Sequence, residues 1–177
     1  TAARDPSAVA GVDERESVTF AEIDRRSSIV AAELARQGVG PHDAVALLAR
    51  NSAGFIVSMV AISKLGADIL YANTGFAGPQ LGDVLESENV SAIVADDEFA
   101  GIVNQHAGSL PRLWSWVDDG SAPADSIAGV VAAAGDGPAP ELPSPEAEGR
   151  HVILTSGTTG RPKGAARGSP SVLSGAV

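Results

Sequence analysis

Short apolar runs alternate along this chain with segments of helical periodicity, and this alternation limits the possible folds more than any other feature. The run Ala44–Ala49 is apolar throughout, which is typical of a strand buried on both faces of a sheet. Further apolar runs follow at 68–71, 91–95, 113–117 and 151–154. Strands that alternate with helices form βαβ units. The sequence therefore predicts an α/β fold with a mostly parallel sheet and helices on both faces.

The segments between these runs carry helix signals. Thr19–Glu22 is a capping box, in which the Thr and Glu side chains bind backbone groups at a helix start. Apolar residues at helical spacing follow it until Gly38, which marks the end of the helix. Further helices are expected at about 52–65, 80–88 and 125–133, and a short strand at 9–12.

Residues 135–149 break this pattern with four prolines, several acidic residues and no apolar period. Such a composition is typical of a linker or an exposed loop. We therefore expect an α/β subdomain at 1–134, a Pro/Gly-rich acidic linker or loop at 135–149, and a further segment at 150–177 that opens with a strand.

Composition excludes several classes of function. The chain has 177 residues and a net charge of −10, so nucleic acid and anionic membranes are not expected partners. It contains no cysteine, which excludes disulfides and thiolate metal sites and is compatible with a cytoplasmic location. The most apolar stretch, 55–71, is interrupted by Lys64 and Asp68, so no transmembrane segment is expected.

The stretch Thr155–Gly164 directly follows the last apolar run and reads Thr-Ser-Gly-Thr-Thr-Gly-Arg-Pro-Lys-Gly. Glycines let another molecule approach the backbone, and backbone N–H groups, hydroxyls and a lysine together can bind an anion. The stretch is not the common P-loop, because Pro162 and Gly164 stand where that motif needs Gly and Ser or Thr. The pattern favours a polyphosphate site, with an ordinary polar surface loop as the alternative.

The same ten residues resemble the phosphate-binding signature of the adenylate-forming enzymes: acyl-CoA synthetases, peptide-synthetase adenylation domains and luciferases. Every fixed position of that signature is met by Thr155 to Gly164. Segments 19–27, 38–47 and 62–68 are also similar to family segments, in the family's order. The resemblance covers most of residues 9–166 and is closest to an acyl-CoA synthetase.

This resemblance implies an ATP-dependent ligase that joins a carboxylate, such as a fatty acid, to a thiol. The carboxylate would form an acyl-adenylate with release of pyrophosphate, and coenzyme A would then take the acyl group. ATP, Mg²⁺ and coenzyme A are the implied cofactors and substrates. The residues implied to bind the ATP phosphates or pyrophosphate are Thr155, Ser156, Gly157, Thr158, Thr159, Gly160 and Lys163, with Thr155 at the base of the loop.

The chain starts at Thr1 and stops at Val177, so we expect an N-terminal fragment of a longer enzyme whose missing part is a partner. The resemblance implies that the magnesium, adenine and catalytic lysine residues lie beyond Val177. No catalytic or metal-binding residue is therefore expected within the fragment, which should be inactive alone. An adenylation domain that loads a carrier protein and a non-catalytic module that retains the fold remain alternatives.

Three other groups of residues are weaker candidates for a site. Asp96-Asp97-Glu98 follows a predicted strand and could bind a metal, although acidic residues also favour a helix N-terminus. Trp114 and Trp116 are expected to share one face of a strand and to serve packing rather than ligand stacking. The histidines share no metal-ligand spacing, and each is expected at the surface: His42, His106 and His151.

Overall fold

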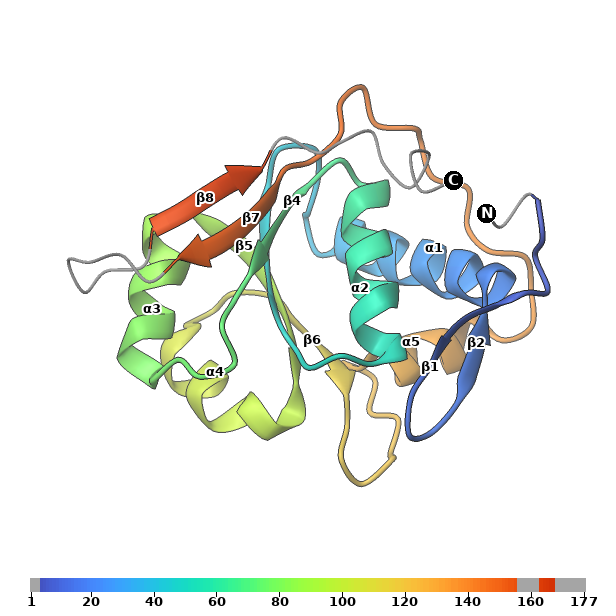
Figure 1. The fold of residues 1–177 in the computed structure, drawn as a ribbon, viewed down its shortest axis with the longest axis horizontal. Coiled ribbons are helices and arrows are strands. Elements are labelled where there is room, and N and C mark those ends of the chain that lie inside the picture. The colour runs from blue at the N-terminus through green and yellow to red at the C-terminus, as the bar shows by residue number, and fades with distance from the viewer. Residues whose placement is uncertain (1–3, 156–162, 168–177) are drawn as a thin grey trace.

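The computed structural model describes residues 4–155 and 163–167. Its elements are, in order, β1 (Val9–Val12), β2 (Ser17–Thr19), α1 (Phe20–Arg36), β3 (Ala44–Leu48), α2 (Ala53–Lys64), β4 (Asp68–Tyr71), α3 (Gly78–Ser87), β5 (Val90–Asp96), the 3-10 turn η1 (Asp97–Phe99), α4 (Ala100–His106), β6 (Arg112–Trp116), α5 (Ile127–Ala134), β7 (His151–Thr155) and β8 (Lys163–Arg167). Figure 1 shows the helices packed around one central sheet.

The central sheet has six strands in the order β6-β5-β3-β4-β7-β8. Neighbouring strands from β6 to β7 are parallel, and only the β7–β8 pair is antiparallel. The chain therefore moves from β3 to β4, returns across β3 to β5 and β6, and crosses back to add β7 beside β4. The predicted α/β fold with a mostly parallel sheet is confirmed.

Helices cover both faces of this sheet, as the sequence predicted (Figure 1). Along β3, Val45 and Leu47 pack into the core beneath α1, α2 and α5. Ala46 and Leu48 pack into a second core, beneath α3 and α4. All of these side chains are buried, which explains why this strand reads as a continuous apolar run instead of an alternating one.

The antiparallel hairpin β1–β2 lies outside the central sheet and packs on the first turns of α1 and α2. Val18 of β2, Ile23 of α1 and Ala53 of α2 form the small core beneath it. The sequence predicted the first strand of the hairpin but not β2, because three residues are too few to show a period.

The other helix predictions differ from the structure only at their ends. The third helix begins at Gly78 instead of Gln80, because Pro79 lies in the first turn, where its missing N–H costs no hydrogen bond. The Gln80 side chain accepts a hydrogen bond from the backbone N–H of Ala77 at 3.0 Å. In the described part of the chain, no helix is long and apolar enough to cross a bilayer.

Residues 135–149 form no helix or strand, in agreement with the predicted loop. The Arg25 guanidinium on α1 donates hydrogen bonds to the carbonyl groups of Gly135 and Gly137 and so ties the start of this loop to the helix. The division into segments 1–134, 135–149 and 150–177 stays a prediction, although β7 joins the same sheet as β3 to β6.

Candidate functional site

The predicted phosphate-binding stretch connects the antiparallel strands β7 and β8. Thr155 is the last residue of β7, Lys163 is the first residue of β8, and the two are paired across the strands. The other predicted contacts, Ser156, Gly157, Thr158, Thr159 and Gly160, lie outside the described residues. The structure therefore places the two ends of the stretch.

The stretch leaves β7 at the carboxyl edge of the parallel sheet. Because β7 runs parallel to β4, Thr155 lies at the same edge as the last residues of β3, β4 and β5. Ligands of open α/β sheets bind at this edge, where neighbouring strands connect to helices on opposite faces. Here β3 leads to α2 on one face, and β4 leads to α3 on the other.

An ion pair between the buried Asp68 and the largely exposed Arg150 side chain holds the start of β7 against β4. Asp68 is 5% exposed, and its carboxylate accepts a hydrogen bond from the Arg150 backbone N–H at 2.6 Å. The Arg150 guanidinium donates two more hydrogen bonds to Asp68, from Nε at 2.9 Å and from Nη2 at 2.6 Å. These bonds raise the pKa of Arg150, so its guanidinium stays charged at neutral pH.

An aromatic stack joins α2 to the same two strands. The Tyr71 ring is 6.0 Å from the Phe55 ring and 5.8 Å from the His151 ring, measured between centroids. The Tyr71 hydroxyl is 2.8 Å from Nδ1 of His151. Burial raises the pKa of Tyr71, so its hydroxyl stays protonated and can donate this hydrogen bond. His151 is thus partly buried and bonded, not a free surface residue as predicted.

The acidic triplet after β5 does not form a metal site. Asp96 is 3% exposed and accepts hydrogen bonds from the backbone N–H of Arg50 at 2.7 Å and from the Ser115 hydroxyl. Asp97 accepts from the backbone N–H of Asp118, and Glu98 pairs with the Arg50 guanidinium. Among residues 4–155 and 163–167, no three acidic or histidine side chains converge as metal ligands. Asp97 and Glu98 instead occupy the first turn of η1.

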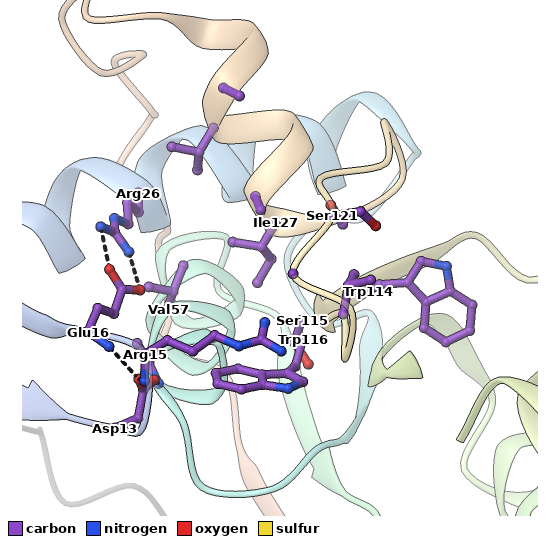
Figure 2. Close-up of a pocket in the computed structure, with 18 residues that line it drawn as sticks. Asp13, Arg15, Glu16, Arg26, Val57, Trp114, Ser115, Trp116, Ser121 and Ile127 are labelled. Atoms are coloured by element: carbon purple, nitrogen blue, oxygen red, sulfur yellow. Dashed lines mark hydrogen bonds and ion pairs between the residues drawn. The ribbon is translucent and has the colours of Figure 1, made fainter. Parts of the chain in front are cut away.

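The expectation that Trp114 and Trp116 share a face is wrong. Figure 2 shows the two indoles pointing away from each other. Trp114 packs against the core beneath α3 and α4, whereas the Arg15 guanidinium lies over the Trp116 ring, with Cζ 3.6 Å from the ring centroid. The pairing of β6 with β5 shifts by one residue between Ala95 and Asp96, and such a bulge turns the following side chains.

A cavity of about 460 Å³ lies beside Trp116, between the β1–β2 hairpin, the first turns of α2 and α5, and the end of β6 (Figure 2). The sequence did not predict this cavity, because its walls come from five separate stretches of the chain. It is remote from the signature stretch, because β5, β3 and β4 separate β6 from β7 in the sheet.

The polar groups around this cavity bind one another. The Asp13 carboxylate accepts hydrogen bonds from the backbone N–H groups of Arg15, Glu16 and Ala53. Glu16 forms two hydrogen bonds with the Arg26 guanidinium, at 2.7 and 2.9 Å. The Ser115 hydroxyl binds Asp96. These contacts connect the hairpin to α1 and α2. They do not indicate a particular class of ligand for the cavity.

Comparison with known proteins places the chain in a family. The family described as AMP-binding enzyme matches residues 1–176. The chain is 27% identical over 169 residues to 4-hydroxybenzoate–CoA/benzoate–CoA ligase from Rhodopseudomonas palustris, covering 93% of this chain and 31% of that ligase. It is 34% identical over 164 residues to malpinin synthetase from Mortierella alpina, covering 92% of this chain and 2% of that synthetase.

A solved structure shares the fold. The apo structure of MbtA from Mycobacterium smegmatis superposes with a TM-score of 0.72 at 30% sequence identity, covering 94% of this chain and 32% of MbtA. The chain therefore spans about a third of the length of the ligase and of MbtA, and a far smaller part of malpinin synthetase.

Proposed function

The chain belongs to the family of AMP-binding enzymes, and from this membership we propose that it forms the N-terminal part of an ATP-dependent acyl-CoA synthetase. The observation that carries the proposal is the complete signature Thr155–Gly164, which starts at the carboxyl edge of the parallel sheet. A fatty acid or another carboxylate is the proposed acyl substrate, and coenzyme A is the proposed acceptor.

In the proposed reaction, a carboxylate oxygen attacks the α-phosphorus of ATP, and the bond from that phosphorus to the bridging oxygen of pyrophosphate breaks. The acyl-adenylate then reacts with the coenzyme A thiol, which gives the thioester and AMP and releases the thiol proton. Negative charge gathers on pyrophosphate in the first step, so preorganised donors that hold it lower the barrier. Holding the terminal phosphates also aligns the α-phosphorus for attack.

We assign this phosphate contact to Ser156, Gly157, Thr158, Thr159 and Gly160, with Thr155 at the base and Lys163 as a supporting charge. Backbone N–H groups and hydroxyls donate to phosphate oxygens, and an ammonium group adds charge. Mg²⁺ accompanies ATP in such reactions, but the described residues assemble no group of carboxylates to hold it. The proposal therefore assigns magnesium to no residue of this part of the chain.

An adenylation domain that loads a carrier protein is the second candidate function. It is favoured by the similarity to malpinin synthetase, of which this chain covers only 2%, so that the similar segment is a small part of a very long protein. The two candidates share the first reaction step and differ in the thiol that accepts the acyl group. Thioester formation by the intact enzyme, on coenzyme A or on a phosphopantetheinyl carrier protein, separates them.

Titration of the isotopically labelled chain with pyrophosphate and MgCl₂ tests the phosphate site. We expect amide resonances of residues 155–164 to shift, and we expect Lys163→Met to weaken the binding. Arg36→Met is the matched control, because Arg36 pairs with Glu33 on the exposed face of α1. The proposal fails if residues 155–164 do not respond, or if the control variant weakens binding equally.

A further inference from the structure

The strand that leads into the signature is held in the sheet by a short parallel ladder. β7 pairs with β4 through three residue pairs, Ile69–His151, Leu70–Val152 and Tyr71–Ile153. On its other side lies β8, which begins at Lys163, inside the signature, and pairs antiparallel with β7. The register of β7 against the core of the sheet therefore depends on few contacts.

Hydrophobic patterning specifies this register weakly. Val152 is buried and Ile153 is 46% exposed, and the next residue, Leu154, is again apolar. Because consecutive residues are apolar, a slip of one residue would exchange one buried apolar side chain for another. Such a slip moves the strand by about 3.3 Å and turns each of its side chains to the opposite face. Thr155, where the signature begins, would move with the strand.

The Asp68–Arg150 pair distinguishes the observed register from a slipped one. The Asp68 carboxylate is buried, and its hydrogen bonds within the described residues all come from Arg150. Arg150 in turn accepts a backbone hydrogen bond from Ile69 at 2.8 Å, so its main chain is part of the ladder. A slip would separate the backbone N–H of Arg150 from Asp68 and leave a buried charge with fewer partners, which is strongly destabilising.

The residues on either side of this pair fit the same register. A side chain at Gly149 would overlap the carbonyl group of Ala67, so this glycine allows the two backbones to approach. The hydrogen bond between Tyr71 and His151 joins the same two strands.

We propose that Asp68 and Arg150 are positioning residues that set the register of β7 and thereby place residues 155–164 for phosphate binding. The two residues are 82 positions apart in sequence. Neither contacts the described part of the signature, so the pair acts through the strand. The proposal rests on the phosphate-binding function proposed for that stretch.

Nuclear Overhauser contacts across β4 and β7, measured in the labelled 177-residue chain, test the register directly. We expect contacts between Leu70 and Val152 in the wild type. In Asp68→Asn and Arg150→Met we expect these contacts to be lost, or a second set of contacts from a slipped register to appear beside them. Contacts between Ala46 and Ile93, which pair β3 with β5, should stay unchanged and show that the variants are folded. Arg150→Met keeps the backbone bond to Asp68, so it serves as the milder variant.

Pyrophosphate affinity in the same samples tests the consequence. We expect a loss of about tenfold or more in Asp68→Asn and Arg150→Met, since small displacements of a binding group have large effects. Arg150→Lys should recover part of the affinity, and Arg36→Met should have no effect. A purely structural role would not give recovery by lysine together with unchanged contacts between β3 and β5.

The proposal is overturned if Leu70–Val152 contacts persist in both single variants, or if β3–β5 contacts are lost to the same extent. A wild-type chain that binds no pyrophosphate would instead refute the phosphate-binding function. In that case the contacts across β4 and β7 still decide whether the pair sets the register.

Discussion

At the scale of single residues, the tightest backbone approach around the signature strand occurs at Gly149. This residue lies against the main chain of Ala67, just before β4, and a Cβ atom would overlap the Ala67 carbonyl group. The obstacle is backbone and not a flexible side chain, so neither partner can move without disturbing the β4–β7 ladder.

We predict that Gly149→Ala lowers the free energy of unfolding by about 1–3 kcal/mol, because the added methyl group overpacks this contact. Urea denaturation at equilibrium measures the effect. Gly101→Ala is the matched control, since Gly101 lies within α4 and a methyl group there would meet open space. The control should be neutral or stabilising by up to about 1 kcal/mol, and equal destabilisation of both variants would contradict the prediction.

Asp96 is a second residue whose environment has a measurable consequence. Burial raises the pKa of Asp96 above its ordinary value of 3.8, and hydrogen bonds from Ser115 and Arg50 offset this only in part. The folded state therefore holds the Asp96 proton at pH values where the unfolded state has released it. Stability contributed by this group falls as pH rises from the ordinary carboxyl pKa through the raised pKa.

Asp96→Asn should remove this component of the pH dependence. The amide can still accept from the Arg50 N–H and can donate to the Ser115 hydroxyl, so both contacts are retained. We expect the free energy of unfolding of the variant, relative to wild type, to increase from about pH 4 to pH 7. Urea denaturation across this range checks the prediction, and a constant difference between the two proteins would contradict it.

At the scale of elements, α1 shows how a local sequence pattern becomes a contact. The Thr19 hydroxyl accepts a hydrogen bond from the Glu22 N–H at 3.2 Å, and Glu22 accepts one from the Thr19 N–H at 2.7 Å. The backbone bond from Thr19 lowers the pKa of Glu22, so this end of the helix is stable while Glu22 is ionised. Thr19 is also the last residue of β2, so the cap fixes where the hairpin meets the helix.

Thr19→Ala should lower the free energy of unfolding by about 1 kcal/mol. The substitution removes the hydroxyl that accepts from the Glu22 N–H and donates to the Glu22 carboxylate. Thr19→Ser is the control and should retain most of the stability, since its hydroxyl can accept the same bond. Thermal or urea denaturation monitored by circular dichroism distinguishes the two variants. Equal stability of the alanine and serine variants would show that the cap contributes nothing.

At the scale of the whole molecule, the signature starts at the carboxyl edge of the sheet, and helices cover both faces of that sheet. Two cores, one on each face, hold β3, β4 and β5 in place. The chain covers 31% of the length of the similar CoA ligase. A phosphate-binding site alone does not provide an adenine site, an acyl pocket or a group that stabilises the reacting carboxylate.

We therefore predict that the 177-residue chain does not catalyse carboxylate-dependent exchange of pyrophosphate into ATP, although we expect it to bind pyrophosphate. The exchange is measured with labelled pyrophosphate and a panel of fatty and aromatic carboxylates. Exchange above the level without carboxylate would contradict this prediction and would place the whole adenylation site within these residues.

Much of this architecture could be predicted because it depends on local patterns. The apolar runs 44–49 and 91–95 became β3 and β5, and the capping box Thr19–Glu22 begins α1 as predicted. The Ser52 side chain accepts a hydrogen bond from the Phe55 N–H at the start of α2. The shared face of Trp114 and Trp116 was predicted wrongly, because a bulge depends on the pairing of two strands and leaves no local pattern. The phosphate contacts of Ser156 to Gly160 remain a prediction.

The sequence by itself determined the alternation of strands and helices, the caps of α1 and α2, and the family signature, because each depends on residues close together in the chain. Only the tertiary structure decided that β7 inserts beside β4, that Asp68 meets Arg150, and that Tyr71 meets His151. These contacts join residues about 80 positions apart, and their formation depends on the sheet that the intervening helices and strands complete.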